Sequence, residues 1–235
     1  MGMSSARRKD MKLIIFVLPA FLFYAVFVLI PAGGGFWYSL TDWNGLYRDS
    51  NFIGIANYVE ALTEDPVFIR SIIFTLKYVF FMVVLQNVSA LFLALLIENR
   101  KKTKTLFRTI FFMPNMISMV IAGFMWLFIF TKVIPGIAGI GGLGFLKQSW
   151  IGDPRWSFYS ILIVSLWAGV GYLMIIYIAA LQGIPKQLVE AAEIDGAGRI
   201  ALLRYIKLPM ILPAVTISLF LSLNSSFKVF EVVYA

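Results

Sequence analysis

Long, uninterrupted runs of apolar residues dominate the chain. Five of them are long enough to cross a bilayer, whose hydrocarbon core of about 30 Å needs roughly 20 apolar residues in helical conformation. They extend over Leu13–Ile30, Ile72–Ile97, Ile110–Phe130, Phe158–Leu181 and Ile211–Tyr234. Because the runs are continuous and do not alternate with a period of two, they favour helices over the strands of a membrane barrel. The pattern predicts an all-α polytopic membrane protein.

Composition supports this fold class and excludes several kinds of chemistry. Of 235 residues, 60% are hydrophobic and 14% charged, with a mean hydropathy of +0.87, whereas soluble domains are about 45–50% apolar and about 25% charged. The chain has neither Cys nor His, which excludes disulfides and thiolate catalysis and removes the commonest general base and metal ligand. We therefore expect no catalytic residue and no metal site on this chain, and the composition argues against a soluble globular enzyme.

The basic residues predict the orientation of the runs. Four Lys and Arg precede the first run, five lie between the second and third, and four lie between the fourth and fifth. The intervening segments on the other side hold five basic residues together with six acidic ones. Because cytoplasmic loops are enriched in Lys and Arg, residues 1–12 are predicted to be cytoplasmic. The net charge of +8 then reflects topology and attraction to anionic lipid, with no nucleic acid as partner.

The segment 182–210, on the same side as the N-terminus, has a pattern of its own. Pro185 stands where a helix can begin, and apolar and acidic residues alternate at helical spacing up to Gly196. A second short, basic helical pattern follows, which Pro209 is expected to close before Pro213 begins the next span. The sequence predicts two short amphipathic helices hinged at glycine. The acidic first helix favours docking onto a protein over floating on lipid.

The same segment carries a recognisable motif. It contains Glu190-Ala191-Ala192, then Gly196 after three residues, then Ile206 after nine more and Leu208-Pro209 after one. This spacing matches the EAA signature of binding-protein-dependent ABC importer permeases at every fixed position. The strings IPKQLVEAAEIDGAGRIALLRYIKLPMILPAV and FRTIFFMP resemble the carbohydrate, maltose-type branch of that family.

The resemblance implies a transport subunit that couples to a separate ATPase. In such permeases the EAA loop docks into a cleft on a cytoplasmic ATPase, and small residues and a glycine turn suit that contact. The coupling residues implied here are Glu190, Ala191, Ala192, Asp195, Gly196, Ile206, Leu208 and Pro209. Because the chain lacks the phosphate loop G-x₄-G-K-[ST], ATP and Mg belong on the partner. The implied partners are an ATPase dimer, a second permease subunit and an extracytoplasmic substrate-binding protein.

Polar residues within the spans are candidates for the substrate pathway, since polar groups in a membrane generally face a bundle interior or cavity. The candidates are Asn224, Ser222, Ser225, Asn87 and Gln86. Neutral hydrogen-bonding groups beside aromatic rings suit a sugar, although the same residues can serve as contacts between helices. The alternatives are an ABC permease for glycerol phosphate or another small polar solute, a secondary transporter driven by an ion gradient, or a membrane-embedded enzyme.

The resemblance also sets expectations for location and completeness. It implies a multi-pass protein of a bacterial or archaeal cytoplasmic (inner) membrane. The domain predicted is an importer transmembrane domain over 13–235, with the coupling loop at 182–210 inside it. Permeases of this family continue into a sixth helix, so we expect five helices of a six-helix core and a chain truncated at its C-terminus.

Overall fold

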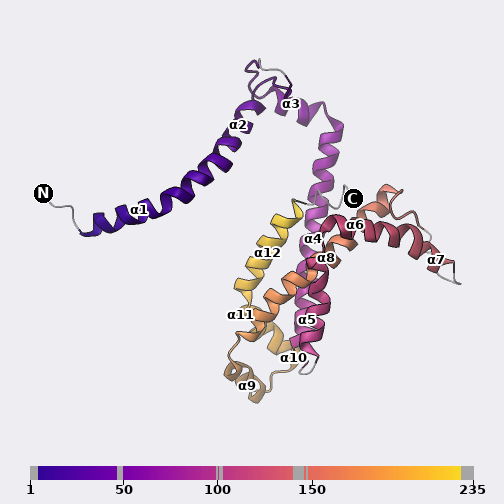
Figure 1. Ribbon diagram of the computed structural model, residues 1–235. Helices are drawn as coiled ribbons and strands as arrows, with labels where there is room; N and C mark the ends of the chain where they lie inside the picture. The colour runs from indigo at the N-terminus through magenta and orange to yellow at the C-terminus, as the bar shows by residue number, and fades with distance from the viewer. Residues whose placement is uncertain are drawn as a thin grey trace. The chain divides into compact units, whose positions relative to one another are not determined.

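The computed structural model describes residues 5–46, 50–98, 100, 103–139, 146 and 148–228, with side chains from Ile14 onward. The described residues are mostly helical, and their only β-type pairing is an isolated bridge between Thr41 and Phe52. The chain divides into two compact units, Met1–Ile72 and Ile73–Ala235. This confirms the predicted all-helical fold class, and each unit is described by itself below (Figure 1).

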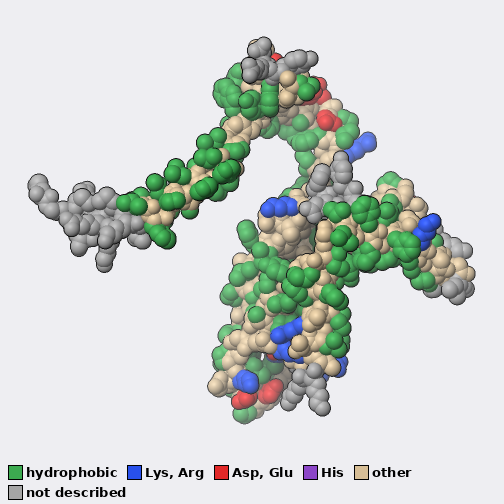
Figure 2. All heavy atoms as spheres, in the orientation of Figure 1, with side chains coloured by type: hydrophobic (Ala, Val, Ile, Leu, Met, Phe, Trp, Pro, Cys, Tyr) green, Lys and Arg blue, Asp and Glu red, His purple; other side chains and the backbone are tan. Residues whose placement is uncertain are grey.

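The first unit begins with a long apolar helix. It combines α1 (Ser5–Tyr24), a π-helical segment η1 (Ala25–Leu29) and α2 (Ile30–Ser39). The stretch Ile14–Ser39 has a mean hydropathy of 2.7, and none of it is buried within the unit. The helix therefore extends nine residues beyond the predicted end at Ile30. Apolar side chains cover the part of the helix whose side chains are described (Figure 2), a surface that suits lipid or another membrane helix.

Hydrogen bonds hold together the short segment that follows this helix. The Asn57 side chain on α3 (Ala56–Thr63) donates to the carbonyl oxygens of Ser39 and Thr41 at 2.9 and 2.8 Å. The carboxylate of Asp42 accepts from the backbone and side-chain amides of Asn51, and these bonds lower the pKa of Asp42 below its usual value. The polar loop is thus ordered locally by side-chain contacts.

The second unit is built on three helices: α4 (Pro66–Glu98) from Ile73 onward, α8 (Pro154–Gln182) and α12 (Leu212–Ser226). The small residues Ala90 and Ala94 of α4 are fully buried in a core that they share with α8. The buried core consists of Ala90, Ala94 and Ile97 from α4, Val170, Leu173, Met174, Tyr177, Ile178 and Leu181 from α8, and Ile184 and Ile211. The predicted second and fourth spans are confirmed as Pro66–Glu98 and Pro154–Gln182.

The third predicted span, Ile110–Phe130, is wrong as a single helix. The chain forms α5 (Lys104–Phe112), then a 3₁₀ turn η2 (Met113–Met116), and becomes extended at Ile117. Pro114 within the 3₁₀ turn lacks an N–H and cannot continue the α-helical ladder. A new helix then runs through α6 (Met119–Phe128), η3 (Ile129–Val133) and α7 (Ile134–Ala138). The candidate span is therefore Met119–Ala138.

The fifth predicted span also differs from the structure. After α9 (Lys186–Ile194), one helix runs continuously through α10 (Arg199–Ala201), the π-helical η5 (Leu202–Lys207) and α11 (Leu208–Met210). Pro209 lies inside this helix and does not close it; the break comes at Ile211, where α12 turns away by 69°. Pro213 is in the first turn of α12 as predicted. Within the described residues α12 ends at Ser226, followed by a turn that contains Lys228; Tyr234 lies outside them.

By length and composition, four helices can cross a membrane, or five if the bent pair forms one span; this statement covers the described residues. The count agrees with the polytopic prediction.

Gly171 fixes the closest approach between α5 and α8. A Cβ atom added there would overlap the carbonyl group of Phe111 and lie 2.8 Å from the Cα of Phe112. Because the obstacle is backbone, no rotamer change can relieve it. The absence of a side chain at Gly171 therefore allows the two helix backbones to touch.

Replacing Gly171 by Ala should force α5 away from α8 and destabilise the unit by about 1–3 kcal/mol, as overpacking typically does. Thermal unfolding in detergent, followed by tryptophan fluorescence, measures this loss. Gly183→Ala is the matched control, since its added Cβ would meet nothing closer than 3.4 Å. Equal midpoints for the two variants would contradict the proposed backbone contact.

Candidate functional site

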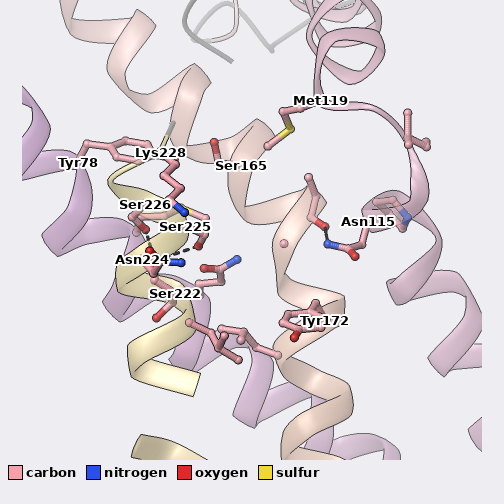
Figure 3. A pocket seen from close by; sticks show the side chains of 18 residues that line it. Tyr78, Asn115, Met119, Ser165, Tyr172, Ser222, Asn224, Ser225, Ser226 and Lys228 are labelled. Atoms are coloured by element: carbon pink, nitrogen blue, oxygen red, sulfur yellow. Dashed lines mark hydrogen bonds between the residues drawn. The ribbon is translucent and has the colours of Figure 1, made fainter. Parts of the chain in front are cut away.

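The second unit contains a cavity of about 500 Å³ between its helices (Figure 3). Its walls come from α4, the turn η2, the start of α6, α8, α12 and the turn after α12. The polar and aromatic residues of the wall are Tyr78, Gln86, Asn115, Ser165, Tyr172, Ser222, Asn224, Ser225, Ser226 and Lys228. The cavity thus offers neutral hydrogen-bonding groups, two tyrosine rings and one cation among its described lining residues.

Gln86 and Ser165 have unused hydrogen-bonding capacity in this wall. Both side chains are more than nine-tenths buried, yet Gln86 Oε1 and Ser165 Oγ have no hydrogen-bond partner among the described residues. Gly169 makes room for Gln86, because a Cβ there would overlap the Gln86 amide. A buried polar atom without a partner costs about 1–3 kcal/mol. Both atoms are closed off from the cavity in this conformation, so a solute or water would satisfy them only after side chains move.

Asn87, next to Gln86 in sequence, is used differently. It is buried, and its Nδ2 donates to Ser222 Oγ on α12 and to the Val83 carbonyl, each at 2.8 Å. Its Oδ1 accepts from the Tyr177 hydroxyl on α8 at 2.8 Å. One amide therefore links α4, α8 and α12, and it does not belong to the cavity wall.

Four of the five pathway residues predicted from sequence line this single cavity: Gln86, Ser222, Asn224 and Ser225. Ser222 and Ser225 donate to carbonyl oxygens of their own helix, whereas Asn224 is exposed (Figure 3). Sequence reasoning did not include Ser165 and Tyr172 among the candidates. They occur as isolated polar groups in an apolar helix, and only packing shows that they face the cavity.

A separate site lies at the other end of the unit, where α9 ends in a tight turn. Gly196 has φ +81°, a left-handed conformation that glycine adopts without steric cost. The Gly196 N–H donates to the Glu193 carbonyl at 3.1 Å, and the Ala197 N–H donates to the Ala192 carbonyl at 2.9 Å. These two bonds form a Schellman cap. Gly196 therefore ends α9 and reverses the chain toward α10, which is the hinge predicted from the motif.

The motif residues differ in their exposure. Glu190, Ala191, Asp195, Gly196 and Pro209 are exposed, while Ala192, Ile206 and Leu208 are half-buried. Two large apolar side chains beside the turn, Ile194 and Ile200, are 86% and 83% exposed. The ordered turn at Gly196 thus has an exposed isoleucine on either side.

A charged cavity of about 520 Å³ lies behind α9. Its charged lining residues are Glu98, Lys104, Lys186, Glu190, Glu193 and Lys207. Lys207 Nζ lies 3.0 Å from Glu98 Oε2, with side-chain exposures of 15% and 21%. The Gln182 amide, oriented with its oxygen toward the two cations, accepts from Lys104 Nζ and Arg108 Nη2 at 2.5 and 2.9 Å. Figure 2 shows these charges gathered at the end of the unit that carries α9.

No group of three or more His, Cys, Asp or Glu residues that could hold a metal occurs in the described part of the chain. Glu231, the acidic residue of the fifth predicted span, lies outside it. The two cavities described above therefore offer hydrogen bonding, aromatic contact and charge pairing.

Comparison with known proteins places this chain among permeases. A family model described as binding-protein-dependent transport system inner membrane component matches residues 86–234. The probable starch degradation products transport system permease protein AmyD of Thermoanaerobacterium thermosulfurigenes is 40% identical over 217 residues, covering 92% of this chain and 73% of the relative. The sn-glycerol-3-phosphate transport system permease protein UgpA of Pectobacterium atrosepticum is 32% identical, covering 85% of this chain and 67% of the relative.

The fold has a counterpart among solved structures. A chain of a bacterial alginate ABC transporter, solved in complex with an alginate pentasaccharide-bound periplasmic protein, superposes with a TM-score of 0.76 at 24% identity. The match covers 92% of this chain and 72% of that one. The family model and the curated relatives identify an ABC permease, in place of the secondary transporter considered from sequence. The chain belongs to the family of binding-protein-dependent ABC transporter inner membrane components, a multi-pass permease subunit of the inner membrane.

Proposed function

We propose that this permease forms part of the import pathway for a sugar or sugar-like solute, and that the cavity bounded by α4, α8 and α12 contacts that solute. The observation that carries the proposal is the pair of buried, unpartnered atoms Gln86 Oε1 and Ser165 Oγ in the cavity wall. A sugar has hydroxyls that would satisfy both atoms once side chains move to admit them, and an apolar ring face that suits Tyr78 and Tyr172. A relative named for starch degradation products supports this solute class.

The second part of the proposal concerns energy coupling. The segment 182–210 is proposed to dock onto a cytoplasmic ATPase dimer, which supplies ATP and Mg, through Glu190, Ala191, Ala192, Asp195 and the turn at Gly196. The exposed Ile194 and Ile200 support this role, because they would be buried in such a contact. It follows that the end of the second unit carrying α9 faces the cytoplasm. A second permease and a substrate-binding protein complete the proposed complex.

A Gly196→Val variant should weaken coupling without preventing membrane insertion. A β-branched residue at φ +81° is strained by roughly 1–2 kcal/mol or more, so the turn should open and misplace α9. Solute-stimulated ATP hydrolysis by the reconstituted complex should fall roughly tenfold, the equivalent of about 1.4 kcal/mol. Gly198→Val is the control, because Gly198 has φ −69° and open space around it. Normal stimulation in Gly196→Val would contradict docking through this turn.

Asn87 and Asn224, the two asparagines predicted to line the pathway, should differ in the effect of their replacement by alanine. Asn87→Ala removes the acceptor of the Tyr177 hydroxyl and the donor to Ser222 Oγ, so the midpoint of thermal unfolding should fall by the equivalent of about 1–3 kcal/mol. Asn224→Ala removes an exposed side chain that makes no side-chain hydrogen bond among the described residues, so its midpoint should be unchanged. Its maltotriose uptake into proteoliposomes should nevertheless fall. Unchanged uptake in Asn224→Ala, at equal protein level, would remove Asn224 from the pathway.

Lys228 supports a second candidate solute, an anionic one such as glycerol phosphate. It is the one cation among the described residues of the cavity wall, and one relative is a glycerol-3-phosphate permease. If the solute is anionic, Lys228→Gln should reduce its uptake by roughly 10- to 100-fold, the worth of a charged hydrogen bond. If it is a neutral sugar, uptake should change by no more than about twofold. Parallel uptake of maltotriose and glycerol 3-phosphate distinguishes the two.

A further inference from the structure

The ion pair between Glu98 and Lys207 connects parts of the chain that lie far apart in sequence. Glu98 is the last residue of α4, and Lys207 is the last residue of the π-helical segment η5. The two charged atoms are 3.0 Å apart, and both side chains are largely shielded from solvent. Shielding strengthens a charge pair relative to one on an open surface.

The position of Glu98 is not favoured by its own helix. The C-terminus of a helix carries partial negative charge, so a carboxylate in the last turn is destabilising unless a cation compensates it. Lys207 supplies that cation from the segment 182–210. The pair is thus an interaction of α4 with the coupling loop. Within α4 alone, nothing favours a glutamate at its last position.

A second contact joins α4 to α12, the helix that follows the coupling loop. Asn87 on α4 donates to Ser222 on α12 at 2.8 Å. Glu98 lies 11 residues beyond Asn87, about 16 Å along α4 at 1.5 Å per residue, and Lys207 and Ser222 are joined through the bend at Ile211. The two contacts thus connect α4 to the chain from η5 to α12 at two points. The solute cavity lies next to the second point, the contact between Asn87 and Ser222.

We propose that Glu98 and Lys207 are positioning residues that make α4 follow the coupling loop. The loop is covalently continuous with α8 and α12 but reaches α4 only through non-covalent contacts. Nearer the cavity, the apolar core and the Asn87 amide attach α4 to α8 and α12. At the end of α4 next to the loop, the ion pair is the charged contact through which a displacement of the loop would reach α4. This inference rests on the proposed docking of the loop to an ATPase.

Charge reversal tests the proposal in the reconstituted importer. Glu98→Lys and Lys207→Glu should each lower the maltotriose or glycerol 3-phosphate transported per ATP hydrolysed by roughly fivefold to tenfold, the range for a partly shielded pair. The swapped double variant E98K/K207E should restore most of the ratio. Arg204→Glu is the matched control, because Arg204 is an exposed cation three residues earlier on the same segment. Unchanged ratios in both single variants, or a double variant no better than either, would overturn the proposal.

A distance measurement gives a readout that a purely stabilising ion pair would not move. The chain has no Cys, so spin labels can be placed uniquely at Leu96 and Met210, which are 51% and 47% exposed. Their distance should stay constant between the nucleotide-free and the ATP–vanadate states, and should change between states in Glu98→Lys. A wild-type distance that changes as much as that of the variant would overturn the proposal.

A further label distinguishes this proposal from the one on which it rests. A Cys placed at Ala192 should cross-link to an ATPase subunit in the wild type and in the reversal variants alike. No cross-link in the wild-type background would contradict docking of the loop. A normal cross-link with unchanged transport ratios in the reversal variants would contradict the positioning role alone.

Discussion

The packing of the helices in the second unit depends on the hydrogen bonds of one buried side-chain amide, that of Asn87. Within a membrane, a polar side chain without a partner cannot fall back on water, so its hydrogen bonds decide which helices can pack together. The Asn87 amide donates twice and accepts once, and its partners lie on α4, α8 and α12. The cavity forms beside this junction, because the three helices are held at a distance that side chains such as Gln86 and Ser165 do not fill.

The glycines and prolines determine how closely and in which direction the helices meet that junction. Gly171 lets α5 touch α8 through the backbone, and Gly169 leaves space for Gln86. Pro114 interrupts the helical ladder so that Asn115 comes to the cavity wall instead of continuing along α5. Each of these residues lowers local helix stability, and the packing of the apolar core compensates for it.

Hydropathy alone predicted the spans at α1–α2, α4 and α8, because a long apolar run in lipid has no alternative to a helix. Hydropathy did not predict the helix breaks at Pro114 and Ile211. The sequence remains apolar on both sides of each break, although the backbone changes direction there. The gapped motif correctly predicted the turn at Gly196, because a backbone position with a positive φ favours glycine. Nothing local distinguishes Asn87 from Asn224, or pairs Glu98 with Lys207 across 109 residues; those assignments need the fold.

The π-helical segment η5 gives the spacing of the motif a physical meaning. A π turn accommodates one residue more than an α turn, so the nine residues between Gly196 and Ile206 include one that a regular helix would not need. Each residue added or removed there would rotate everything after it by about 100°, carrying Lys207 away from Glu98 and Ile206 to another face. The number of residues in that gap therefore sets the direction in which the side chains after it point. It determines whether Lys207 faces α4.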